Sequence, residues 1–355
     1  MFRNIILRVL LSPFALLYGL IILCINFTYD IGLQKSSKFS IPVIGVGNLS
    51  IGGTGKTPHI EYLIDLLKDY IDIATLSRGY KRNTKGFRLV RDQDTALTVG
   101  DEPLQFHRKF PDITVAVSES RAYAIPQILQ YNPSVETILL DDAFQHRGVL
   151  PGLQLLLTSY DQLFTKDYLL PAGRLREWRA GATRADVAIV TKCPINLTAK
   201  EKNEIMDSFK SYKLKEVFFT YYEYSDLYDF HQKSNIRSLD KSDQILLLSA
   251  IANTDYLYDY LLPRVADIKE IEYTDHHTFD TRDIHHIHKV FSNITSPNKY
   301  VVTTEKDAMR LEMHASLLQK LGIEVRVLPI KVAFHFDEKA NFDKLIKDFL
   351  LDFKA

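Results

Sequence analysis

Short apolar runs with little alternation recur along the first half of the chain, with helical spacing of apolar residues between several of them. The runs lie at 41–46, 71–77, 113–117, 137–142, 153–157 and 186–191. Strands without alternation are typical of a parallel sheet covered on both faces. The pattern therefore predicts an α/β fold with a doubly wound parallel sheet, with ligands at the carboxyl ends of its strands.

A second, smaller set of apolar runs begins beyond a polar helix expected at 198–212. These runs lie at 245–249, 268–273, 300–303 and 325–329. They predict a smaller C-terminal α/β domain at 241–355, following a core domain at 36–212. The segment 213–240 between the two is rich in tyrosine and polar residues, and we expect it to form a linking ribbon.

One junction between strand and helix carries a phosphate-binding loop. The run 41–46 leads into GNLSIGGTGKTP at 47–58, and apolar residues then follow helical spacing. The glycines let backbone N–H groups face a polyphosphate, Lys56 reaches the terminal phosphates, and Thr57 can hold Mg²⁺. Ser50 stands where the common pattern has glycine, and a flexible turn is the alternative. Because both flanking elements fit, the loop predicts nucleotide binding in a P-loop NTPase-like domain.

The first 35 residues predict a membrane-associated helix. Val9 to Asn26 carry no charge, and Arg3 and Arg8 precede them. A cleaved signal peptide would need small residues after this run, and none follow. A spanning helix with its basic end in the cytoplasm would place the phosphate loop outside, away from ATP. A helix lying on or dipping into the inner face fits better, and a buried core helix is the alternative.

The composition bears on which partners and which cellular compartment the sequence favours. The chain has 355 residues, with 44 Lys and Arg against 44 Asp and Glu, so no basic balance points to a nucleic-acid partner. With only two cysteines in the sequence, we expect no disulfide framework, which fits a reducing compartment. The sequence Thr-Lys-Cys-Pro at 191–194 lacks the aspartate that follows the lysine of guanine-specific proteins, which favours ATP over GTP.

Three acidic or histidine segments are candidates for chemistry. Asp141 and Asp142 end an apolar strand, where a carboxylate of a phosphate-loop protein holds Mg²⁺ or its water, although a solvated turn is the alternative. Asp101 and Glu102 could serve the same chemistry or simply begin a helix. The third segment, Asp275-His276-His277, pairs histidine with carboxylate as a proton acceptor does, the alternatives being a metal pair or a surface loop.

Cationic segments at 77–82 and 169–177 could clamp phosphate groups of a substrate as well as those of ATP. Either segment alone could equally be surface charge.

These segments, in this order, resemble the tetraacyldisaccharide 4′-kinase family, the lipid A pathway kinases of Gram-negative bacteria. The resemblance runs over nearly the whole chain, from the apolar N-terminal helix through VGNLSIGGTGKTP, LSRGY, VGDEP, DDAFQHR, LLPAGRLRE, VTK, DHHTF and VTTEKDAMRL. It implies transfer of the γ-phosphate of ATP to the 4′-hydroxyl of tetraacyldisaccharide 1-phosphate, giving lipid IVA. Because this acceptor is embedded in a membrane, the resemblance also implies a site at the cytoplasmic face of the inner membrane.

The resemblance implies roles for individual residues. Asp101 would accept the proton, oriented by His276, with His277 as the alternative. The other roles are ATP binding by Asn48, Gly52, Gly53, Thr54, Gly55, Lys56 and Thr57, metal binding by Thr57, Glu102, Asp141 and Asp142, and headgroup binding by Arg78, Tyr80, Gln145, His146, Arg174 and Arg176.

Two other functions are compatible with the phosphate loop. One is a membrane-anchored ATPase switch, to which the histidine segment and the paired arginines would be surplus. The other is a soluble phosphate-loop ligase or small-molecule kinase, which the N-terminal helix disfavours.

Overall fold

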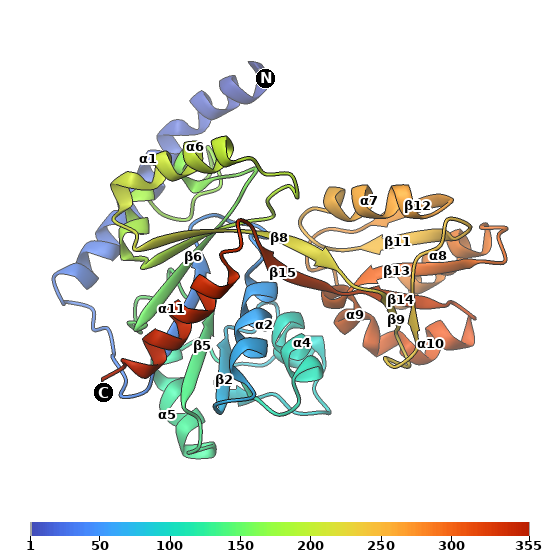
Figure 1. Ribbon diagram of the computed structural model, residues 1–355, viewed down its shortest axis with the longest axis horizontal. Helices are drawn as coiled ribbons and strands as arrows, with labels where there is room; N and C mark the ends of the chain where they lie inside the picture. The colour runs from blue at the N-terminus through green and yellow to red at the C-terminus, as the bar shows by residue number, and fades with distance from the viewer. Residues whose placement is uncertain (1, 355) are drawn as a thin grey trace.

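The apolar runs of the first half form one large sheet in the computed structural model, which describes residues 2–354, with side chains from Ile6 onward (Figure 1). Neighbouring strands are parallel except at the two edges of this sheet. Its nine strands lie in the order β15 (Ile330–Phe334), β8 (Glu216–Tyr224), β7 (Val187–Thr191), β6 (Leu153–Ser159), β1 (Val43–Asn48), β5 (Thr137–Asp141), β2 (Ile73–Ser77), β4 (Thr114–Val117) and β3 (Arg88–Leu89).

The strands of this sheet lack alternation because both of its faces are covered. Every residue of β1, β2, β5 and β7 is buried. Each of the six predicted runs overlaps one of its strands, so the predicted doubly wound α/β fold is confirmed. The helices of this larger unit are α1 (Phe2–Asp30), α2 (Lys56–Leu67), α3 (Ala96–Val99), α4 (Asp101–Lys109), α5 (Arg121–Tyr131), α6 (Ala199–Phe209) and α11 (Lys339–Leu351).

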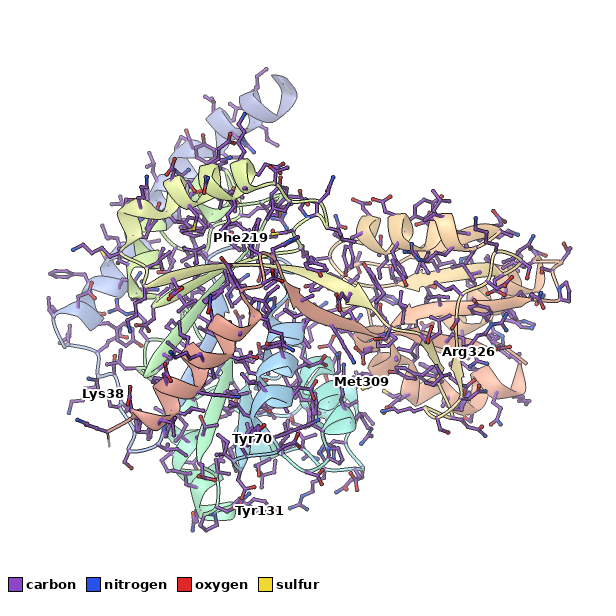
Figure 2. The ribbon with its side chains drawn as sticks, viewed as in Figure 1. Lys38, Tyr70, Tyr131, Phe219, Met309 and Arg326 are labelled. Carbon is purple, nitrogen blue, oxygen red and sulfur yellow. The ribbon has the colours of Figure 1, made fainter. Side chains whose placement is uncertain are left out.

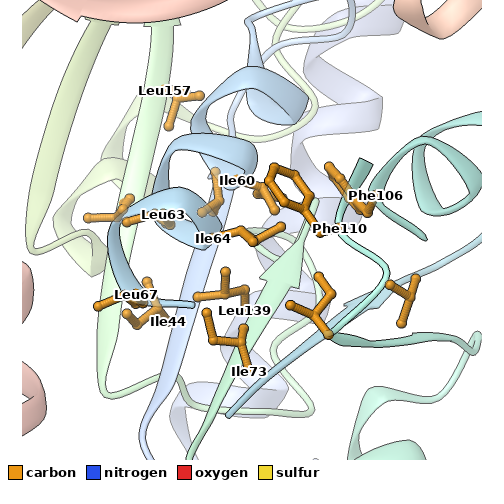
Figure 3. Packing of buried hydrophobic residues seen from close by; sticks show 14 of the residues in the cluster. Ile44, Ile60, Leu63, Ile64, Leu67, Ile73, Phe106, Phe110, Leu139 and Leu157 are labelled. Atoms are coloured by element: carbon orange, nitrogen blue, oxygen red, sulfur yellow. The ribbon is translucent and has the colours of Figure 1, made fainter. Parts of the chain in front are cut away.

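Helix α2, which begins at the phosphate loop, is anchored by its apolar face. Ile60, Leu63 and Ile64 recur at helical spacing and pack over Ile44 and Leu139 of the sheet (Figure 3). Burying one such side chain fully stabilises the fold by about 1.5–3 kcal/mol. The helix that positions the loop is therefore held firmly against the strand that leads into the loop.

The smaller unit has its own sheet of six strands. Its helices are α7 (Asp255–Leu261), α8 (Thr281–Ser292), α9 (Glu305–Leu311) and α10 (Ala315–Lys320). The strands lie in the order β10 (Ile236–Arg237), β9 (Leu227–Asp229), β14 (Val325–Leu328), β13 (Lys299–Thr304), β11 (Gln244–Ser249) and β12 (Asp267–Glu272), which includes all four strands predicted for the second domain.

The chain crosses between the two units twice, and here the structure differs from the predicted domains. The segment expected as a ribbon at 213–240 contains β8, a strand of the large sheet, and β9 and β10 of the small one. The region 241–355 is also divided, because β15 pairs with β8 and α11 packs on the large sheet (Figure 1). Figure 2 shows Phe219 of β8 in the larger unit and Arg326 of β14 in the smaller one.

Helix α1 runs along one side of the larger unit, and its N-terminal end extends beyond it (Figure 1). By length and composition, Ile6–Asp30 could cross a membrane, and only 11% of its most apolar 18-residue stretch is buried. One face is nevertheless bonded to the larger unit. The Tyr18 hydroxyl donates to the Arg176 carbonyl at 2.7 Å, and the Trp178 indole N–H donates to the Gly19 carbonyl at 2.8 Å.

Candidate active site

The phosphate loop joins β1 to α2 in a conformation that its glycines permit. Gly52 and Gly55 have φ angles of 103° and 84°, in the left-handed region that side chains other than glycine rarely adopt. Lys56 is the first residue of α2, so the N-terminal N–H groups and the helix dipole face the loop. The loop therefore has the local geometry of an anion-binding site.

Lys56 is held at the centre of this site by two oxygens. Its Nζ donates to Asn48 Oδ1 at 3.3 Å and lies 3.5 Å from Asp142 Oδ1. The Asn48 amide in turn donates to the Ser50 carbonyl at 2.8 Å, which braces the loop. Arg176 also contacts both Asn48 and Asp142, with its guanidinium 2.9 Å from Asp142 Oδ1. Two cations thus meet at the carboxyl end of β5.

Asp141 and Asp142 follow each other at that strand end but differ in electrostatics. Burial and then the neighbouring Glu102 carboxylate raise the pKa of Asp141 to about 7. Burial also disfavours the charge on Asp142, but Lys56 and Arg176 outweigh it and hold the pKa of Asp142 well below its usual range. Adjacent carboxylates in such different fields are typical of functional sites.

The residues expected to hold Mg²⁺ fit that ion. Asp141 Oδ1 is buried and has no hydrogen-bond partner among the described residues, so it is available to bind a cation. Thr57, Glu102, Asp141 and Asp142 all line the same cleft and offer hard oxygen ligands. No three acidic, histidine or cysteine side chains within residues 2–354 form a complete metal site. Mg²⁺ is usually bound by one or two carboxylates together with substrate phosphates and water.

Asp101 and His276, which the sequence places 175 residues apart, meet across the two units. His276 Nδ1 lies 3.0 Å from Asp101 Oδ2, and both residues are largely buried. The Tyr80 ring packs edge-on against the imidazole, with ring centroids 4.9 Å apart. His277 instead bonds to Asp283 at 2.8 Å. The structure therefore pairs His276, and not His277, with Asp101.

Two cations of α9 complete this cluster, and neither was among the predicted site residues, although both lie in the VTTEKDAMRL segment. Arg310 Nε donates to Asp101 Oδ2 at 3.0 Å, and Lys306 Nζ lies 2.9 Å from Glu102 Oε1. Burial alone would raise the pKa of Asp101, but Lys306, His276 and Arg310 hold it well below its usual range. Asp101 therefore stays an anion in this state. The EKDAMR segment resembles a solvated helix face, so only the fold shows that these charges point inward.

The predicted headgroup residues divide into two groups. Arg78, Tyr80 and Arg176 line the cleft. The others have different surroundings: the Gln145 amide donates to the Asn48 carbonyl at 2.9 Å, and His146 Nε2 lies 3.2 Å from the guanidinium of the buried Arg121. Burial and then Arg121 lower the pKa of His146 to about 4. These two side chains support the loop and the β5 end rather than the cleft wall.

Arg174 and Lys192 approach the tip of the phosphate loop. An added Cβ on Gly52 would collide with the Arg174 guanidinium, and one on Gly53 would lie 3.8 Å from Lys192 Nζ. Burial lowers the pKa of Lys192 to about 8, and its ammonium lies over the Tyr256 ring at 4.8 Å. Lys192 is a cleft residue that was not among the predicted site residues, although the VTK segment that contains it was noted.

The two units enclose a cleft of about 420 Å³, lined by the phosphate loop, the end of β5 and residues of the smaller unit. Loop residues 50–58 form one wall, and Asp275, His276 and Lys306 of the smaller unit face them. A phosphate donor bound at the loop would place its terminal group near Lys56, with a carboxylate–histidine pair close by to receive a hydroxyl proton. This combination of fold and cleft defines a phosphate-loop kinase.

Comparison with known proteins identifies the family. The family model described as tetraacyldisaccharide-1-P 4′-kinase matches residues 7–350. A tetraacyldisaccharide 4′-kinase of Flavobacterium psychrophilum is 45% identical over 97% of each chain, and one of Bacteroides thetaiotaomicron is 42% identical over 95% of this chain and 91% of the relative. The crystal structure of LpxK from Aquifex aeolicus in complex with ATP has a TM-score of 0.73 at 30% identity, covering 97% of this chain and 99% of that one. The chain belongs to the tetraacyldisaccharide 4′-kinase family, and it is an ATP-dependent kinase.

Proposed function

We propose that this kinase transfers the γ-phosphate of ATP to the 4′-hydroxyl of tetraacyldisaccharide 1-phosphate, forming lipid IVA in lipid A biosynthesis. The observation that carries the proposal is that the phosphate loop and His276, which is bonded to the buried Asp101, line one cleft between the two units. Family membership supplies the acceptor, because the relatives bear the name of that reaction. Incubating the protein with this acceptor and ATP, then locating the new phosphate on the disaccharide by NMR, tests the proposal. A phosphate at any other hydroxyl would contradict it.

The phosphate loop binds and orients the donor. Backbone N–H groups around Gly53 and Gly55 face the polyphosphate, and Lys56 neutralises the charge that develops on the transferred group. Thr57, Glu102, Asp141 and Asp142 would hold Mg²⁺, which would supply positive charge to offset that of the donor phosphates. Asn48 contacts Lys56 and Arg176 contacts Asp142, and these contacts hold the Lys56 and Asp142 side chains beside each other.

Asp101 acts as proton acceptor late in the transfer. Its carboxylate accepts hydrogen bonds from the Glu102 N–H at 2.9 Å, from His276 and from Arg310, so it is a weak base while all three donors remain. Phosphoryl transfer proceeds through a loose transition state in which positioning and charge stabilisation dominate. A weakly basic carboxylate can orient the hydroxyl and take its proton as the new bond forms. Closure of the two units would keep water from competing with the hydroxyl.

The outward face of α1 supports docking at the inner-membrane surface. Large apolar side chains cover it, each more than two-fifths exposed: Ile6, Leu7, Val9, Leu10, Phe14, Leu16, Leu17, Leu20, Ile21, Leu23, Ile25 and Phe27. An apolar patch of this extent marks an interaction surface. Because the opposite face bonds to the larger unit through Tyr18 and Gly19, the helix would lie along the bilayer rather than cross it. This arrangement brings the cleft to an acceptor that stays in the membrane.

Polar substitutions on that face should abolish membrane binding without disturbing the nucleotide site. We expect the double variant Leu17→Gln/Ile21→Gln to lose co-sedimentation with anionic liposomes while it binds ATP normally. The matched control is Leu262→Gln/Leu351→Gln, which changes two side chains elsewhere that are also at least half exposed. Equal liposome binding by both variants would contradict the docking face. Deleting the whole helix is a poorer test, because Tyr18 contacts the segment that carries Arg176.

Affinity for ATP should fall as the pH rises past 8 if Lys192 faces the bound nucleotide. In the free protein its pKa is lowered to about 8 by burial; Asp161 and Asp275 oppose this, while Arg174 and Lys306 add to it. A bound polyphosphate favours the ammonium form of Lys192. The affinity for ATP therefore has its full value below this pKa and falls by up to about tenfold per pH unit above it. Lys192→Arg should remove the dependence, because guanidinium stays protonated. Calorimetric titration between pH 7 and 9.5 checks this, and parallel curves for the two proteins would refute the role.

A further inference from the structure

Lys306 bridges the two halves of the catalytic cluster. Its ammonium lies 2.9 Å from Glu102 Oε1 of the larger unit and 3.4 Å from His276 Nε2 of the smaller one. The side chain is 19% exposed and lines the cleft. Glu102 is joined to Asp101 in the chain, and Asp101 is bonded to His276. The four groups therefore form a closed ring across the boundary between the units.

This ring determines which nitrogen of His276 carries the proton. An ammonium has three donors and no acceptor, so in its contact with Lys306 at 3.4 Å Nε2 is the acceptor; the Asp275 carboxylate, the other charged group that faces Nε2, lies farther away at 3.8 Å. In the neutral imidazole the proton then resides on Nδ1, which donates to Asp101 Oδ2 at 3.0 Å. Without Lys306, the imidazole could take the other tautomer, whose unprotonated Nδ1 would repel the Asp101 carboxylate.

We propose that Lys306 is a positioning residue that fixes the tautomer and orientation of His276, so that the proton-accepting pair assembles only when the two units meet. The inference rests on the proposed function in so far as that function makes Asp101 and His276 the acceptor pair. Lys306 and His276 both come from the smaller unit, whereas Asp101 and Glu102 come from the larger one. One side chain thus connects the approach of the units to the arrangement of the reacting groups.

Other ion pairs along the same interface provide the contrast that separates positioning from simple adhesion. Helices α4 and α9 face each other there, and Arg108 of α4 lies 3.3 Å from Glu312, just after α9. This pair joins the same two units with similar chemistry, but neither residue lines the cleft or touches Asp101 or His276. Arg108→Met is therefore a matched control for Lys306→Met.

The test compares Lys306→Met, Lys306→Arg and Arg108→Met with the wild type. We expect Lys306→Met to lower kcat by about 100-fold, the effect of misplacing a catalytic group by about an ångström, with KM for ATP changed less than about threefold. Lys306→Arg should recover part of the loss, since it restores a donor and a charge. Arg108→Met should retain kcat within about twofold. Equal losses in Lys306→Met and Arg108→Met, or a loss confined to KM, would overturn the proposal.

A spectroscopic measurement keeps the inference separable from the proposed reaction. The ¹⁵N chemical shifts of the His276 ring, assigned by comparison with His276→Gln, should show a ring protonated at Nδ1 in the wild type. We expect these shifts to change in Lys306→Met and to stay the same in Arg108→Met. This result does not depend on which acceptor the kinase uses. An unchanged His276 signature in Lys306→Met would refute the positioning role even if lipid phosphorylation is confirmed. Failure of the wild type to phosphorylate the lipid would refute the reaction and leave the tautomer result standing.

Discussion

Lys56→Ala should lower kcat by about 10²–10³-fold or more while the protein stays folded. The side chain sits at the loop between Asn48 and Asp142, where a transferred phosphoryl group gains negative charge, and removing a preorganised cation costs that much transition-state stabilisation. The fold should tolerate the change, because the α2 core face is formed by other residues and Arg176 still pairs with Asp142.

The measurement is turnover at saturating ATP and acceptor, together with the thermal unfolding midpoint. Lys68→Ala is the control, since it removes a cation just beyond the other end of α2, where it pairs with the exposed Asp65 and lies over the Phe110 ring, away from the cleft. It should leave kcat unchanged. A loss of only a few-fold in Lys56→Ala would remove Lys56 from the role of stabilising the transferred group.

Asp101→Asn and His276→Ala should each lower kcat by about 10²–10⁴-fold, the range for a positioned acid or base, and the double variant should lose little more than the worse single one. Residues that act as one unit show this non-additivity, because either change already disables the pair. The 3.0 Å contact between them across the two units is the physical reason to expect it. Asparagine is preferred at 101 because it can still accept from the buried Arg310.

His277→Ala provides the matched control, because this neighbouring imidazole bonds to Asp283 and stacks on Tyr273 instead of facing Asp101. It should keep kcat near the wild-type value. Losses that multiply in the Asp101/His276 double variant would mean that the two residues act independently. If His277→Ala were as impaired as His276→Ala, the assignment of His276 as the partner of Asp101 would be contradicted.

Local patterns in the sequence were sufficient for the central strands of both sheets and for the phosphate loop. A fully buried strand such as β1 is apolar along most of its length, and a loop that bends at Gly52 and Gly55 before a lysine is recognisable by its glycines. The carboxylates at the end of β5 could also be predicted from the sequence, because ligands bind at the carboxyl ends of parallel strands.

Non-local pairing explains the elements that were missed. The β8 segment EVFFTYYEY mixes aromatic and polar residues, and its partner β15 follows more than 100 residues later, so nothing local assigns it to the large sheet. The same holds for Lys306 and Arg310, whose spacing on α9 resembles a solvated face. Only the packing of α9 against α4 turns them toward Asp101 and Glu102.

The central claim is that this protein moves the γ-phosphate of ATP onto a membrane-embedded acylated disaccharide. The most direct test is transfer of labelled γ-phosphate from ATP to tetraacyldisaccharide 1-phosphate in detergent micelles, with Lys56→Ala measured alongside. We predict label in the lipid with the wild type and its loss in the variant. Label released only as free phosphate would contradict the kinase reaction and would instead support a membrane-anchored ATPase switch.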